Sequence, residues 1–100
     1  MKPYYLVIFH PLAKKEFEES VGWYEKALIG LGEEFIRDIE DVVKVLEHQP
    51  RLFAIRKKNL REAPTKKFPY LLVYKVNKDE VIITSVFHTS RSPKQKYKKR

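Results

Sequence analysis

The hydrophobic pattern of this chain changes its period at Pro50, and this change limits the folds that the chain can adopt. Before Pro50, apolar residues recur every three or four positions, which is the spacing of one helix face. After Pro50, two runs at residues 70–76 and 81–87 are rich in β-branched and aromatic side chains, as strands are. Helices followed by strands predict an α+β domain.

The first half predicts one strand and a helical hairpin. Residues 4–9 are aromatic or apolar without a break, which predicts a strand buried on both faces. Pro11 then begins a helix, and its apolar face is Ala13, Phe17, Val21, Tyr24 and Leu28. A break at residues 30–32 precedes a second helix with the stripe Phe35, Ile39, Val42, Val43 and Leu46. Because the connection is short, we expect the helices to be antiparallel.

The second half predicts three strands. Residues 59–63 form a weak strand candidate, and the polar residues 77–80 join the two strong runs into a β-hairpin. The order is strand, helix, helix and three strands, so we expect the helical hairpin to pack on one face of a mostly antiparallel sheet. Residues 1–93 then form a single domain, and residues 94–100 form a basic C-terminal tail. Because residues 92–100 have no apolar period, we expect them to fray.

The size and composition indicate one soluble domain. One hundred residues suffice for one hydrophobic core. The chain has no cysteine, so nothing points to secretion. The apolar run at residues 4–9 is too short for a signal peptide or a membrane span. We therefore expect a cytoplasmic protein without a membrane partner.

The two halves carry opposite charge. Residues 1–50 hold six Lys/Arg and ten Asp/Glu, whereas residues 51–100 hold fifteen Lys/Arg and three Asp/Glu. Blocks of one sign favour a partner of the other sign, so the first hypothesis is polyanion binding, with RNA ahead of DNA or an acidic protein. We expect the basic residues to gather on the sheet face that the helices leave open. The alternative is a solvated, lysine-rich surface.

Most established catalytic motifs are absent. The chain contains no glycine-rich phosphate loop, no His-Glu-x-x-His and no Gly-x-Ser-x-Gly. Its three histidines, His10, His48 and His88, are far apart in the sequence, so we expect no metal and no cofactor. Most of the acidic residues follow the spacing of exposed helix faces.

The remaining candidates suit RNA cleavage. The 2′-hydroxyl of RNA is its own nucleophile, so a protein needs only proton transfer and positive charge on the phosphate. His88 has a side chain that titrates near neutral pH. Arg61 and Arg91 can each bind phosphate with two hydrogen bonds, and Tyr97 can stack on an exposed base.

Each candidate also has a structural interpretation. His88 ends a strand, where it can simply hydrogen-bond a backbone carbonyl. Arg91 can hold the tail against the sheet, and Arg61 can pair with a helix carboxylate. Tyr97 lies among lysines in the tail and can be disordered. Trp23 lies beside the apolar stripe of the first helix and can contact a partner.

The motifs together resemble the RelE/ParE superfamily of bacterial toxins. In the second half the resemblance covers Phe68-Pro69-Tyr70-Leu-Leu-Val-Tyr74, the turn, the strand at 81–87 and His88-Thr89-Ser90-Arg91-Ser92-Pro93. In the first half it covers Ala13-Lys-Lys-Glu-Phe17, Trp23-Tyr24 and Gly30-Leu-Gly32-Glu-Glu-Phe35. The order of the elements agrees over nearly the whole chain.

The resemblance implies the toxin of a type II toxin–antitoxin module, of the kind called plasmid stabilisation proteins. Its partner would be a small antitoxin that wraps around the toxin. RelE-like members cut mRNA in the ribosomal A site, whereas ParE-like members inhibit DNA gyrase without hydrolysis. We favour the endoribonuclease, because a histidine and two arginines are expected near one rim. A third alternative is a degenerate member that only binds its antitoxin or nucleic acid.

The resemblance also implies the site residues. Arg61, either His88 or Arg91, and Tyr97 occupy places that match the catalytic residues of RelE-like toxins. A lysine pair of such toxins corresponds either to Lys57 and Lys58 or to Lys66 and Lys67. The charge of the tail predicts that it binds RNA phosphates without base selection, through Lys94, Lys96 and Lys98.

Overall fold

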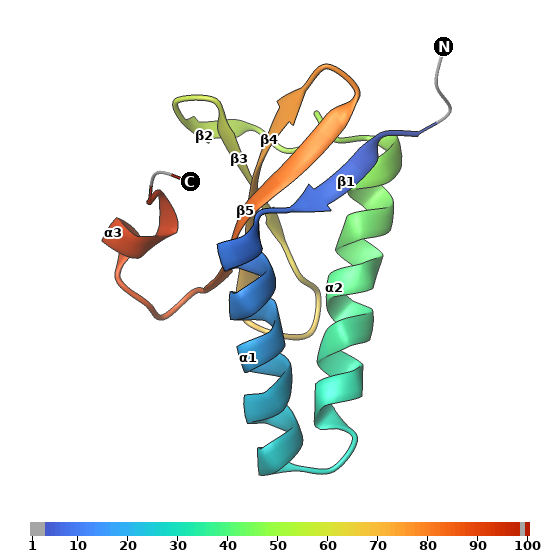
Figure 1. Ribbon diagram of the computed structural model, residues 1–100, viewed down its shortest axis with the longest axis vertical. Coiled ribbons are helices and arrows are strands. Elements are labelled where there is room, and N and C mark those ends of the chain that lie inside the picture. The colour runs from blue at the N-terminus through green and yellow to red at the C-terminus, as the bar shows by residue number, and fades with distance from the viewer. Residues whose placement is uncertain (1–3, 99) are drawn as a thin grey trace.

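The computed structural model describes residues 4–98 and Arg100, and at positions 93 and 95 it describes the backbone alone. One strand is followed by two helices, four strands and a short helix (Figure 1). The elements are β1 (Leu6–Phe9), α1 (Pro11–Ala27), α2 (Leu31–His48), β2 (Ile55–Lys57), β3 (Leu60–Pro64), β4 (Tyr70–Asn77), β5 (Glu80–His88) and α3 (Pro93–Lys96). The predicted α+β order is confirmed, and β2 is an additional strand.

The strands form one sheet in the order β1-β5-β4-β3-β2. β1 runs parallel to β5, and the other three pairs are antiparallel. The mostly antiparallel sheet is thus confirmed. β2 was missed because its three residues are all exposed and show no alternation of burial. Among the described residues, no helix is both long and apolar enough to span a membrane.

The core lies between α2 and the helix-facing side of the sheet. Phe35 and Leu46 of α2 are fully buried, as are Leu72 and Tyr74 of β4 and Ile83 of β5. Burial of each such side chain contributes about 1.5–3 kcal/mol. The stripe predicted for α2 is therefore confirmed.

The α1–α2 hairpin is closed by a tight turn. Gly30 has φ +91°, a left-handed conformation that favours glycine. The Glu25 carboxylate accepts hydrogen bonds from the backbone N–H groups of Gly30 and Gly32, at 3.0–3.1 Å. The predicted α1 stripe ends before this turn, because Leu28 caps α1 and is 63% exposed.

The prediction that the first strand is buried on both faces is wrong. Burial alternates along β1, and Leu6 is 59% exposed. β1 is the edge strand of the sheet, and only its Val7 and Phe9 side chains pack against the core. The unbroken apolar run of β1 therefore consists of side chains that alternately face the core and the solvent at the edge of the sheet.

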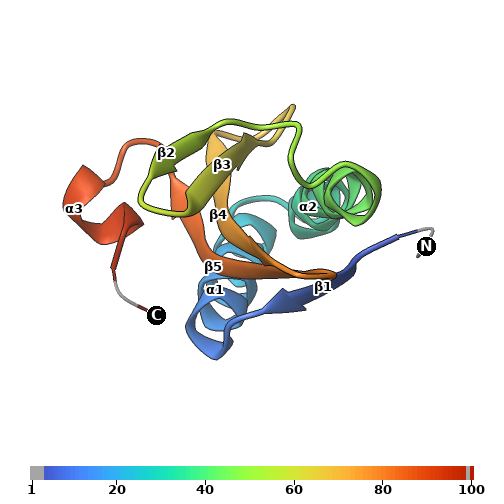
Figure 2. The ribbon, with the colours of Figure 1, turned by 90° about the horizontal axis from the view of Figure 1, so that it is seen from above.

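The predicted fraying of residues 92–100 is wrong for the described part of this segment. The segment forms α3 and packs on the sheet, and Figure 2 shows α2 and α3 on opposite sides of β4 and β5. The Lys96 ammonium lies 3.1 Å from the Glu62 carboxylate of β3, and the Tyr97 hydroxyl donates to the same carboxylate. The tail was unpredictable because polar contacts, not an apolar stripe, hold it.

Arg100 completes the part of the β5 edge that β1 does not cover. β1 pairs with β5 only as far as Ile83. Beyond that point, Arg100 donates to the Thr84 carbonyl oxygen at 2.8 Å. The Glu16 carboxylate of α1 accepts from the Val86 backbone N–H and pairs with Arg100, both at 3.0 Å. These side chains satisfy edge groups that a strand would otherwise pair.

Candidate functional site

A pocket of about 360 Å³ opens between α1 and the end of β5. The chain turns sharply there, because the Arg91 backbone N–H donates to the His88 carbonyl oxygen at 3.0 Å. The turn places His88 and Arg91 opposite Trp23 and Tyr24 of α1 in the lining of the pocket. Two residues from the end of the chain thus meet two from its first helix.

Aromatic rings form the wall of this pocket. Ring centroids lie 5.1 Å apart for Trp23 and Tyr24, 6.3 Å for Tyr24 and Tyr70, and 5.1 Å for Tyr70 and His88. The Tyr70 hydroxyl donates to the buried Ser20 hydroxyl at 3.1 Å. Burial, followed by the neighbouring Tyr70, raises the pKa of Tyr24 to about 12. Tyr24 is therefore uncharged at neutral pH.

Two contacts from Ser90 to the His88 ring favour one tautomer of this histidine. The Ser90 backbone N–H lies 3.1 Å from His88 Nδ1, and the Ser90 hydroxyl lies 2.7 Å from the same nitrogen. A backbone N–H can only donate, so in the tautomer that makes this contact the lone pair is on Nδ1. The neutral ring then holds its proton on Nε2. His88 is therefore a hydrogen-bond donor at Nε2.

Arg91 adds a second donor to the pocket. Its side chain is exposed, and within the described part of the chain no ion pair involves its guanidinium. Among the described residues that line the pocket, Glu19 is the one carboxylate. The pocket therefore combines an aromatic wall with two N–H donors, which suits an anion attached to an apolar group.

Arg61 lies away from this pocket and holds a loop. Its guanidinium Nη1 donates to the carbonyl oxygens of Phe53 at 2.6 Å and Arg51 at 3.4 Å. These partners are backbone carbonyls and not the helix carboxylate considered above. Burial raises the pKa of the neighbouring Tyr74 to about 12 against the opposing charge of Arg61. Arg61 thus stabilises the segment between α2 and β2.

Tyr97 lies on the other face of the sheet from His88. It donates to Glu62, and the neighbouring Ala63 side chain is in the core. Successive side chains of a strand point to opposite faces, so Glu62 and Tyr97 are on the face away from the helices. The Lys57 ammonium lies 5.3 Å from the Tyr97 ring centroid. Of the four expected catalytic residues, the structure brings together only His88 and Arg91.

The expected RNA-binding lysines occupy separate parts of the surface. Lys57 and Lys58 form the exposed end of the β2–β3 hairpin. Lys66 and Lys67 belong to the loop before β4, where their backbone N–H groups donate to the buried Asp38 carboxylate. Three further lysines lie in the tail and are Lys94, Lys96 and Lys98.

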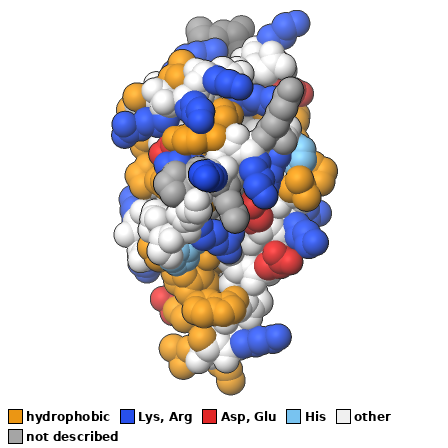
Figure 3. All heavy atoms as spheres, turned by 90° about the vertical axis from the view of Figure 1, so that its left-hand side faces the viewer, with side chains coloured by type: hydrophobic (Ala, Val, Ile, Leu, Met, Phe, Trp, Pro, Cys, Tyr) orange, Lys and Arg blue, Asp and Glu red, His pale blue; other side chains and the backbone are white. Residues whose placement is uncertain are grey.

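The face that carries α3 shows how these charges are distributed. Lys and Arg side chains lie mostly on its upper part, among apolar side chains, whereas its lower part is mainly apolar (Figure 3). This agrees with the expected basic character of the sheet face, although α3 covers part of that face.

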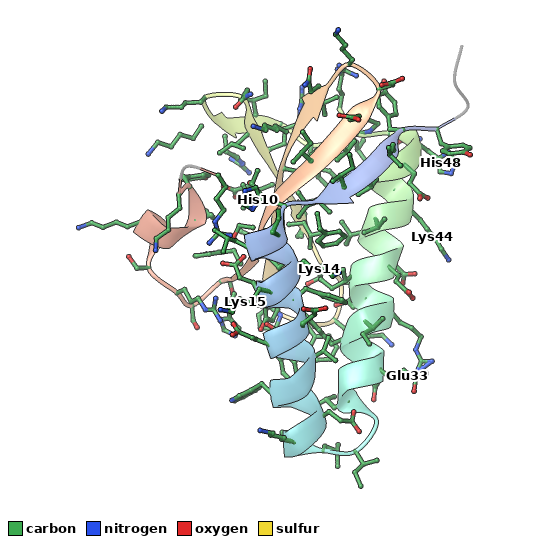
Figure 4. All side chains as sticks on the ribbon, in the orientation of Figure 1. His10, Lys14, Lys15, Glu33, Lys44 and His48 are labelled. Carbon is green, nitrogen blue, oxygen red and sulfur yellow. The ribbon has the colours of Figure 1, made fainter. Side chains whose placement is uncertain are left out.

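The other two histidines lie away from this pocket. Figure 4 shows His10 where β1 meets α1, and His48 at the end of α2. Within the described residues, no three metal-binding side chains of the His, Cys, Asp and Glu types form a group that could hold a metal ion.

Several residues of the site were not singled out from the sequence. The position of Ser90, two residues after His88, indicates its role, because a turn there brings its N–H to the ring. Tyr70 was assigned only to a strand. Glu19 was counted among exposed helix acids. Asp38, which lies outside the pocket, gave no signal because its partners are backbone groups far away in the chain.

Comparisons with known proteins identify related toxins. A family model described as ParE toxin of type II toxin-antitoxin system, parDE, matches residues 7–93. A search of curated proteins finds no match. Among solved structures, one from the chromosomal ParDE TA system of P. aeruginosa is 18% identical, with a TM-score of 0.73 over 89% of this chain and 100% of that chain. The isolated E. coli RelE toxin is 26% identical, with a TM-score of 0.60 over 92% of each chain.

Proposed function

Since this chain belongs to the ParE family of toxins from type II toxin–antitoxin systems, we propose that it poisons its target by binding it and not by cutting RNA. The resemblance to ParE-like toxins implies DNA gyrase as that target. The toxin then acts in the cytoplasm, and its cognate antitoxin releases the target by binding the toxin.

The hydrogen bond between Ser90 and His88 carries this proposal. A general base needs a ring nitrogen with a free lone pair, and a general acid needs a protonated ring. Here Nδ1 accepts from the Ser90 N–H at 3.1 Å, and in the tautomer that makes this contact Nε2 carries the proton. Proton transfer through either route requires this contact to break. The ring is better suited to donate a hydrogen bond to a bound target than to transfer a proton.

The other expected catalytic side chains also support binding over cleavage. The Nη1 group of Arg61 donates hydrogen bonds to two loop carbonyl oxygens. Tyr97 donates its hydroxyl to Glu62 on the other face of the sheet. A ribonuclease that used these residues with His88 would have to rearrange both contacts.

A ribosome-dependent endoribonuclease is the second candidate, and one observation favours it. His88 and Arg91 line the same pocket as the exposed Trp23, and an exposed indole can stack on an RNA base. The phosphate beside that base could then meet Arg91.

Two parallel assays separate the candidates. Purified toxin is added to DNA gyrase and relaxed plasmid, and message from cells that express the toxin is mapped by primer extension. We expect blocked supercoiling and intact message. Cuts within codons that disappear in His88→Ala would overturn the proposal in favour of the ribonuclease. A chain with neither activity would overturn it in favour of a degenerate, binding-only member.

A further inference from the structure

We propose that the pocket between α1 and the end of β5 receives a carboxylate of the cognate antitoxin, carried on an apolar segment. This inference rests on the assignment of the chain as an antitoxin-controlled toxin. It names the part of the surface that the antitoxin engages and the chemistry that it must bring.

The polar half of the pocket selects an anion. The Ser90 N–H contact favours the tautomer with the proton on Nε2, and in that tautomer the ring offers a hydrogen-bond donor. Arg91 is exposed in the same lining, and its planar guanidinium matches a carboxylate with two hydrogen bonds. Glu19 of α1 belongs to the same lining and repels an anion, so we place the carboxylate beside His88 and Arg91.

The aromatic half of the pocket selects an apolar neighbour. Trp23 is 67% exposed and packs edge-to-face against Tyr24 at 5.1 Å. Exposed aromatic side chains beside a cation are typical anchors of protein interfaces. Tyr24 is backed in turn by Phe68 and Phe35 at 4.8 and 5.3 Å. The wall is thus rigid and offers a prepared contact surface.

The apolar surface continues to the tip of the helical hairpin. Leu28 is 63% exposed and Ile29 is 91% exposed at the α1–α2 turn. In Figure 3 the lower part of this face is mainly apolar, whereas most Lys and Arg side chains lie higher, among further apolar ones. A nucleic acid can stack a base on Trp23, but its charged backbone offers no apolar group to the exposed Leu28 and Ile29. A peptide with apolar residues beside an acidic one matches both halves.

The test measures the affinity of the antitoxin encoded in the same module for toxin variants, by isothermal titration calorimetry. We expect Arg91→Gln to weaken binding by about 10- to 100-fold, because the buried carboxylate loses its partner. His88→Phe should have a similar effect. His88→Gln keeps a donor near the Nε2 position and should change the affinity less than about threefold. The matched control is Arg56→Gln on the β2–β3 hairpin, which should bind as the wild type does.

Two outcomes would overturn the inference. One is equal affinity of wild type and Arg91→Gln, and the other is equal weakening by Arg91→Gln and Arg56→Gln, which would indicate a general charge effect. The supercoiling assay on the same variants keeps the two proposals apart. If Arg91→Gln still inhibits gyrase and binds the antitoxin as the wild type does, this inference is wrong and the proposed function stands. If the toxin cleaves message, the proposed function is wrong, and the inference about the antitoxin is judged by the affinities alone.

Discussion

The loop that leads into β4 is held by one buried carboxylate, and its removal should destabilise the fold. Asp38 is 3% exposed. Its oxygens accept the backbone N–H groups of Lys66, Lys67 and Phe68 at 3.1, 2.9 and 2.8 Å. Hydrogen bonds to a charged group contribute about 1.5–3 kcal/mol each, and the donors left behind regain part of this from water. We therefore expect Asp38→Ala to lower the free energy of unfolding by about 3–5 kcal/mol.

The assay is urea unfolding followed by circular dichroism, with Asp41→Ala as the control. Asp41 is exposed on the same helix, so its substitution should change stability by less than about 0.5 kcal/mol. Asp38→Asn keeps one acceptor oxygen and should cost about 1–3 kcal/mol. A loss below about 1 kcal/mol for Asp38→Ala would refute the reasoning, because the three backbone donors would then be satisfied without the carboxylate.

Three further predictions concern stability. Burial opposes ionisation of Glu16, but hydrogen bonds from Arg100 and a β5 amide hold its pKa below the ordinary value. This contribution to stability is present above the unfolded-state pKa and disappears as the pH falls through the folded-state pKa. In urea unfolding at a series of pH values, Glu16→Gln should therefore reduce the loss of unfolding free energy at acid pH. An unchanged loss would contradict this. A Cβ at Gly32 would lie 2.8 Å from a carbonyl oxygen of α1, whereas a Cβ at Gly22 would have no atom within 4 Å. Gly32→Ala should therefore lower the melting temperature, and Gly22→Ala should raise it. Equal shifts would be inconsistent with the close contact of the two helices at Gly32. Tyr74→Phe loses a buried hydrogen bond of 2.6 Å to a loop carbonyl and should cost about 1–2 kcal/mol in the same unfolding assay, so full stability would exclude that bond.

The helical hairpin and the β4–β5 hairpin could be predicted because their apolar residues follow a period. Phe35 and Leu46 of α2 are fully buried, as the stripe indicates. The exposure of Leu6 in β1 could not be predicted, because an apolar run does not reveal whether its strand is central or at the edge. The short strand β2 shows no alternation of burial, because all three of its residues are exposed.

The site was only partly predictable for a related reason. His88 and Arg91 are close in the sequence, so their proximity in space follows from one turn. Arg61 and Tyr97 depend on which face of the sheet each side chain takes, and this depends on the register of β3 and on the path of the tail. The contacts of Ser90 with the His88 ring depend on the turn between these residues, so their spacing in the sequence indicates the contacts only once that turn is known.

The protonation state of His88 tests the central claim most directly. Two-bond proton–nitrogen NMR spectra of the ¹⁵N-labelled toxin near neutral pH distinguish the two ring nitrogens, and His88→Ala identifies the signals. We predict a proton on Nε2 and a bare Nδ1, as the 3.1 Å contact with the Ser90 N–H requires. A proton on Nδ1 would contradict the account, because Nε2 would then be free to accept a proton from RNA.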